Sequence, residues 1–99
     1  MLTPTGAPPL AALKQWLAIS TPAEDALLER LLVSAWQSCS AFAGAALPQD
    51  WGAAPPALAE GILRLAAHLY RERDAGDAAS ATPPAAIAAL WRPFRALRL

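Results

Sequence analysis

The sequence has little charge, a single cysteine and a single histidine. Only 16% of its 99 residues are charged, and eight lysines and arginines balance eight aspartates and glutamates. This balance gives the molecule no overall field that would attract nucleic acid. Because Cys39 has no second cysteine to pair with, an internal disulfide is excluded, which argues against a stapled secreted scaffold and fits a reducing compartment.

Signals for export and for a membrane span are also lacking. The first ten residues, MLTPTGAPPL, contain no basic segment, and Lys14 interrupts any apolar stretch after them. The longest uncharged stretch, 31–49, is broken by polar residues and by Pro48, so it is interpreted as a buried helix face. We therefore expect neither export nor a membrane location.

Apolar residues are abundant. They make up 56% of the chain, whereas ordinary soluble domains contain about 45–50% even with glycine counted. A chain of this length forms about one domain, and a domain this small has limited room inside. We therefore expect part of the apolar surface to serve a partner.

The pattern of apolar residues predicts an all-α fold. Alanine is abundant, β-branched residues are scarce, and apolar positions recur at spacings of three and four. Proline and glycine divide the chain into four helical segments: a short one over 9–18, a long one from Thr21 to Gly44, a long one from Pro56 to about 75, and a shorter one after Thr82 and Pro83. Thr21, Pro22 and Glu24 form a capping box that predicts the start of the second helix.

Each predicted helix carries an apolar stripe. The stripes are Leu10, Leu13 and Leu17 with Trp16 beside them; Leu28, Leu32, Ala35, Cys39 and Phe42; Leu58, Ile62, Leu65 and Leu69; and Ile87, Leu90, Trp91 and Phe94. Trp16 and Trp36 are assigned to the core. Glu60 and Arg64 are spaced to pair on the outer face of the third helix. These features predict a small bundle of two longer and two short helices.

The last quarter of the chain differs from the rest. A helical body, residues 1–77, has five basic against eight acidic residues and a formal charge of −3, whereas residues 78–99 carry three arginines and no acid. The stretch AGDAASAT before the last helix has the composition of a flexible linker. We therefore expect residues 78–99 to form a tethered segment. It consists of a linker, a short helix that is interrupted at Pro93, and a docking tail.

Residues for catalysis or metal binding are sparse. His68 is expected to pair with Glu72 on the flank of the third helix, and Cys39 to act as a small buried apolar residue. One cysteine and one histidine cannot supply a zinc site, and no glycine-rich loop precedes a helix. The sequence therefore predicts no enzyme, no metal and no cofactor.

The C-terminal segment leaves two questions open. Its arginines could contact phosphates, or could simply favour a helix C-terminus and keep the end soluble. Trp91 with Phe94 could anchor a partner, as buried tryptophans do at interface hot spots, or could fold back on this chain's own core. Exchange of the segment with a neighbouring copy would combine both roles.

The order of these segments resembles the small head-tail connector proteins, or adaptors, of tailed bacteriophages and related gene transfer particles. The resemblance covers most of the chain and rests on the order, spacing and total length of short motifs. These are Leu13-Lys14, Trp16-Leu17 and Ile19; Glu24-Asp25, Leu27-Leu28, Leu31-Leu32 and Ala35; Pro56, Leu58, Ile62-Leu63, Leu65-Ala66 and the run HLYRER from His68 to Arg73; and Pro83-Pro84, Ile87, Leu90 and Pro93-Phe94-Arg95.

The resemblance implies a virion structural protein at the head-tail junction, assembled in the host bacterial cytoplasm. About twelve copies would form a ring beneath the portal protein and continue the DNA channel toward a downstream stopper or tail protein, without sequence-specific DNA binding. The portal-docking residues would be Trp91, Arg92, Pro93, Phe94, Arg95, Leu97, Arg98 and Leu99. Candidate contacts with neighbouring copies are Trp51, Arg64, Arg71 and Arg73.

One departure concerns the connection between the second and third helices. Many members of that family have a longer, partly extended loop there, whereas this chain has about a dozen residues. The alternative hypothesis is a small helical DNA-binding or packaging accessory protein, motivated by Arg92, Arg95 and Arg98.

Overall fold

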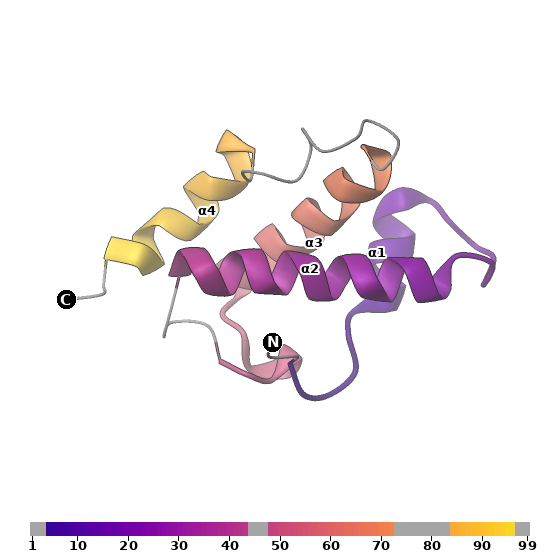
Figure 1. Cartoon of the computed structure of the whole chain (residues 1–99), viewed down its shortest axis with the longest axis horizontal. Helices are drawn as coiled ribbons and strands as arrows, with labels where there is room; N and C mark the ends of the chain where they lie inside the picture. Colours follow the sequence, from indigo (N-terminus) through magenta and orange to yellow (C-terminus); the bar gives the residue numbers. More distant parts are fainter. Residues whose placement is uncertain (1–3, 44–47, 73–83, 97–99) are drawn as a thin grey trace.

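The computed structural model describes residues 4–43, 48–72 and 84–96, with the backbone alone over 94–96. It contains four α-helices: α1 (Leu10–Leu17), α2 (Asp25–Ala43), α3 (Pro56–Arg71) and α4 (Ala85–Ala96) (Figure 1). A single 3-10 turn, Trp51–Ala53, lies between α2 and α3. The described residues contain no β-strand, so the predicted all-α class and the four helices are confirmed.

The helices pack around one core. In Figure 1, α2 runs across α3, with α1 near the start of α2 and α4 near its end, and both short helices also contact α3. Fourteen apolar residues from all four helices form the core: Leu13, Leu28, Leu32, Ala35, Trp36, Cys39, Ala43, Leu58, Ile62, Leu65, Ala66, Ala67, Ile87 and Trp91. The apolar stripes that the spacing predicted for α2 and α3 supply seven of these fourteen residues, whereas Phe42 and Leu69 of the same stripes are only partly buried.

The predicted start of α2 is wrong by about one turn. The helix begins at Asp25 rather than after Thr21, and Asp25 N–H donates to the Pro22 carbonyl in a separate turn. The Glu24 carboxylate, expected to close a capping box, instead accepts a hydrogen bond from the Tyr70 hydroxyl at the end of α3. A contact with a distant helix thus replaces the local cap.

An ion pair joins α1 to the start of α2. Lys14 Nζ lies 2.8 Å from Asp25 Oδ1, and both side chains are partly buried. Together with the bond between Tyr70 and Glu24, this pair connects the first turn of α2 to both α1 and α3.

The fourth helix is part of the bundle. Ile87 is 5% exposed and Trp91 is fully buried, so α4 closes one end of the core. The expected interruption at Pro93 is wrong, because the helix continues to Ala96. Pro93 lacks the N–H that would bond the Ala89 carbonyl, but the buried residues before it hold the helix in place. The linker and the Thr82–Pro83 start signal lie outside the described residues, and the division into 1–77 and 78–99 stays a prediction.

The N-terminal segment pairs with the connection between α2 and α3. Thr5 and Asp50 form an isolated parallel bridge, in which Thr5 N–H donates to the Gln49 carbonyl at 2.6 Å and Trp51 N–H donates to the Thr5 carbonyl at 3.2 Å. Gly6 follows with a φ of +85°, a conformation that glycine adopts without strain. The short connection is therefore tied down by residues that precede α1.

Over the described part of the chain, no helix combines the length and the hydropathy that crossing a membrane requires.

Candidate functional site

The indole of Trp91 lies in a notch on α3. Gly61 leaves the space for it, and the ring centroid of Phe42 lies 5.9 Å from that of Trp91 at an interplanar angle of 56°. Tilted aromatic pairs at this distance are favourable. Trp91 Nε1 is buried and has no hydrogen-bond partner among the described residues. Residues of α2, α3 and α4 thus meet at one indole.

This burial corrects one expectation for the docking tail. Of the two readings of Trp91, anchor for a partner or part of this chain's own core, the structure shows the second, because the side chain is 0% exposed. In this conformation Trp91 has no surface to offer the portal.

The two residues that follow Trp91 in α4 lie at the surface. Arg92 and Pro93 are exposed. The side chains of the other predicted docking residues, Phe94, Arg95, Leu97, Arg98 and Leu99, lie outside the described residues. The structure therefore places the start of the predicted docking tail at the surface, directly after a buried anchor.

Trp51 is held by the turn that contains it. Its side chain is partly buried against the core, and Gly52 N–H donates to Asp50 Oδ1 at 3.4 Å to cap the 3-10 turn. Since Thr5 also pairs with this turn, the position of Trp51 is fixed from two sides. Its partial exposure leaves the predicted contact with a neighbouring copy open.

Arg64 belongs to a surface cluster of three residues. The sequence spacing predicts its pair with Glu60 but not its contact with Trp16. The predicted pair with Glu60 is confirmed, with Arg64 Nε 2.8 Å from Glu60 Oε2. The guanidinium carbon of Arg64 also lies 5.5 Å from the ring centroid of Trp16 on α1, within the range of cation–π contacts. We call Trp16, Glu60 and Arg64 the Trp16 surface.

The assignment of Trp16 to the core is wrong. Its side chain is 43% exposed, and it is the large apolar residue that stands out among the exposed ones in the described chain, whereas Trp36 is 3% exposed as predicted. Trp16 lies beside rather than on the stripe of Leu10, Leu13 and Leu17, and this offset was the signal that could have identified it.

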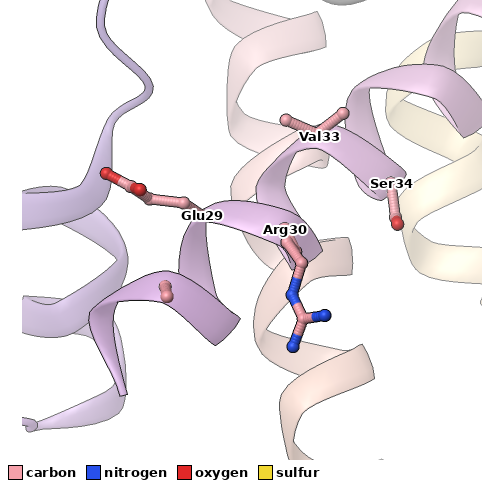
Figure 2. A pocket seen from close by; sticks show the side chains of 5 residues that line it. Glu29, Arg30, Val33 and Ser34 are labelled. Carbon is pink, nitrogen blue, oxygen red and sulfur yellow. The ribbon is translucent and has the colours of Figure 1, made fainter. Parts of the chain in front are cut away.

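A hollow opens on the outer face of α2. It has a volume of about 540 Å³, and the described residues that line it are Ala26, Glu29, Arg30, Val33 and Ser34 (Figure 2). Figure 2 shows the Glu29 and Arg30 side chains leaving the helix in different directions. The residues that line this α2 hollow lie off the buried apolar stripe of α2, and no spacing in the sequence distinguishes them.

The remaining predicted interface residues are the last two arginines of the body. Arg71 is exposed in the last turn of α3, where a cation favours the helix C-terminus. Arg73 lies outside the described residues.

The side chains that could take part in catalysis or metal binding are buried or lie apart from one another in the described chain. Burial raises the pKa of the Cys39 thiol from 9.0 to about 12, so the reactive thiolate is suppressed near neutral pH. What links His68 to Glu72 is a backbone bond, since Glu72 N–H donates to the His68 carbonyl at 2.9 Å. Among the described residues no three histidine, cysteine or carboxylate side chains gather as metal ligands would.

Comparison with known proteins gives one match. The family model described as phage gp6-like head-tail connector protein matches residues 9–86. No curated protein and no solved structure matches the chain significantly. The matched residues include α1, α2 and α3 entirely, together with the first residues of α4.

Proposed function

Because the chain belongs to the phage gp6-like head-tail connector protein family, we propose that it is one subunit of a ring that joins the portal to the tail or to the next connector. Family membership itself makes it a phage head-tail connector protein and a component of the virion. The ring, the portal contact, a continuous DNA channel and assembly in the host cytoplasm belong to the proposal. So do a structural rather than enzymatic role and the extension to gene transfer particles.

The observation that carries this proposal is the length of the match. It extends over residues 9–86 and therefore over the whole of the core formed by α1, α2 and α3. A match to a single helix would describe only a packing pattern, whereas this one includes the order of the helices and the short connection between them.

The fold supports a docking role for the residues after Trp91. Ile87 and Trp91 fix α4 in the core, and Arg92 and Pro93 follow at the surface. We assign portal docking to 92–99, with Trp91 as the anchor that holds the base of this tail inside its own subunit. An anchored base lowers the entropy that a tail loses when it binds.

The neutral total charge fits a DNA conduit. The chain carries eight basic and eight acidic residues. A channel that lets DNA pass must not hold it, and binding of duplex DNA depends mainly on cationic side chains at phosphates.

The proposal is tested by mixing the chain with the portal protein of the same particle and examining the mixture by cryo-electron microscopy. The full chain is expected to add a ring of density beneath the portal, and a chain ending at Trp91 is expected to add none. Thermal melting of the shortened chain serves as the control, because it retains Ile87 and Trp91 and should remain folded. Absence of portal binding by the full chain would overturn the proposal.

A second variant tests whether the charge of the tail, rather than its length, is required for portal binding. Replacing Arg92, Arg95 and Arg98 by glutamine keeps the helix-forming length of the tail but removes its charge. Weaker portal binding by this variant than by the full chain, with an unchanged melting temperature, assigns the contact to the arginines. Equal binding assigns it to the apolar residues of 92–99.

A further inference from the structure

The Trp16 surface combines an exposed indole with two charges. Trp16 is 43% exposed, the guanidinium carbon of Arg64 lies 5.5 Å from its ring centroid, and Arg64 pairs with Glu60 at 2.8 Å. Tryptophan and arginine are enriched among the residues that dominate binding at protein interfaces.

The α2 hollow also combines apolar atoms with two charges. Ala26 and Val33 provide small apolar surface, and Glu29 and Arg30 lie beside them. In the described chain, neither Glu29 nor Arg30 belongs to an ion pair. Both charges are exposed and available to a partner.

The two surfaces correspond in charge. Each carries one acidic and one basic side chain beside apolar atoms, so Arg64 of one surface can face Glu29 of the other, and Glu60 can face Arg30. The hollow is open to solvent rather than enclosed. The described lining comes from one helix, which leaves the hollow open to a side chain on another protein surface.

The surfaces point in opposite directions. On α2, Leu28, Leu32 and Cys39 face the core, and the hollow residues occupy the other face. On α3, Ile62 and Leu65 face the same core, and Glu60 and Arg64 occupy the outer face. Since α2 packs on α3, as Figure 1 shows, their outer faces are turned away from each other, and Glu60 and Arg64 lie away from the α2 hollow of their own chain.

We infer that the Trp16 surface of one copy docks into the α2 hollow of a second copy. This inference rests on the proposed function and specifies the contact between neighbouring subunits of the ring. The contact is heterologous, because each copy uses two different surfaces, and heterologous contacts generate a ring when the rotation from one copy to the next closes. Trp16 is the central side chain of this contact. Ion pairs of Arg64 with Glu29 and of Glu60 with Arg30, each between two copies, set its register.

Two variants remove one surface each. Trp16→Ala removes the projection, and Ala26→Trp fills the hollow with a bulky side chain. Both positions are exposed, so neither change disturbs the core, and circular dichroism and thermal melting check that the variants remain folded. Ala41→Trp is the matched control, because Ala41 is an exposed alanine on the same helix, about 22 Å farther along it.

Native mass spectrometry counts the copies in each assembly, for the chain alone and for the chain with the portal. The wild-type chain and Ala41→Trp are expected to form assemblies of more than two copies in at least one of these samples. Trp16→Ala alone and Ala26→Trp alone are each expected to lose these assemblies. An equimolar mixture of the two variants should give dimers and nothing larger, because only one intact pair of surfaces remains.

The outcomes separate the two proposals. If both variants assemble as the wild type does, or if their mixture forms no dimer, the inferred contact is wrong while the ring itself stands. Dimers formed by Ala26→Trp alone would show a symmetric contact through Trp16 and would also overturn the inference. If the wild-type chain associates neither with itself nor with the portal, the proposed function fails as well.

Discussion

Gly61 and Trp91 fit together so closely that a Cβ on Gly61 would lie 2.0 Å from Trp91 Nε1. No real side chain makes a contact that short, so the indole occupies space that exists only because residue 61 has no side chain. The fit attaches α4 to α3 at the point where Phe42 of α2 also meets the indole. The position of α4, and with it the start of the docking tail, depends on this one glycine.

Gly61→Ala is therefore expected to destabilise the protein, although alanine favours helices more than glycine does. Overfilling a packed core costs about 1–3 kcal/mol. Urea denaturation followed by circular dichroism measures the loss. Gly52→Ala is the matched control, because a Cβ there would meet its nearest atom at an ordinary 3.7 Å. Equal stability of the two variants would contradict the close fit.

Trp91→Ala and Trp16→Ala should differ strongly in cost. Trp91 is fully buried, and truncating a buried tryptophan costs about 3–5 kcal/mol. Trp16 is 43% exposed, and its loss removes a surface contact with Arg64 worth about 0.5–1 kcal/mol. The free energies of unfolding of the two variants, measured in the same denaturant, check the difference. A larger cost for Trp16→Ala would place Trp16 in the core after all.

The ion pair of Lys14 and Asp25 should contribute little to the free energy of unfolding. The pair joins α1 to α2 at 2.8 Å, but both side chains keep contact with water. Pairs of this kind contribute about 0.2–1 kcal/mol. A double-mutant cycle with Lys14→Met and Asp25→Asn isolates the coupling energy, which should fall as salt is added. A coupling of several kcal/mol would mean that the pair is desolvated.

The stability of the protein should depend on the protonation of Cys39 at high pH. Burial raises the pKa of the thiol to about 12 in the folded chain, against 9.0 for the unfolded value. The folded state keeps the proton that the unfolded state loses, so this contribution is complete below pH 9 and declines between pH 9 and 12. The decline is about 1.4 kcal/mol per pH unit.

Cys39→Ala removes this dependence and serves as the reference, because other groups titrate in the same range. The difference in free energy of unfolding between wild type and variant should change with pH only above pH 9. A thiol reagent gives an independent check, since Cys39 should react at the rate of unfolding. Rapid labelling of the folded protein would contradict its burial.

Duplex DNA should bind weakly, if at all. The alternative hypothesis of a DNA-binding accessory protein rests on Arg92, Arg95 and Arg98, whereas the chain as a whole is neutral. Fluorescence anisotropy of labelled duplex at low and moderate salt measures the affinity. Tight binding at low salt that weakens steeply as salt is added would favour the alternative, because such a slope reports phosphate contacts.

Much of the fold could be predicted from the sequence, since periodic apolar residues determine which face of a helix is buried. The stripes that contain Leu28, Leu32 and Cys39, and Leu58, Ile62 and Leu65, supply half of the core residues. The start at Pro56 and the pair of Glu60 with Arg64 follow from local spacing and are confirmed.

The features that were missed depend on contacts between distant residues. The spacing of Glu24 from Thr21 predicts that its carboxylate caps the start of α2. In the structure the carboxylate instead accepts a hydrogen bond from the Tyr70 hydroxyl, 46 residues away. The apolar character of Trp16 favours a place in the core. Only the position of α3 shows that Trp16 lies at the surface, where Arg64 covers its ring. Composition suggested that α4 was loosely attached, whereas Gly61 provides a notch that no pattern within α4 reveals.

The core also has an order of synthesis. Ile87 and Trp91 come after α2 and α3 in the sequence and yet close one end of the bundle. While α4 is still inside the ribosome, α2 and α3 expose the apolar surface that α4 later covers. The core is therefore complete only after α4 has left the ribosome, and a chain terminated before α4 would present that uncovered surface to other proteins in the cell.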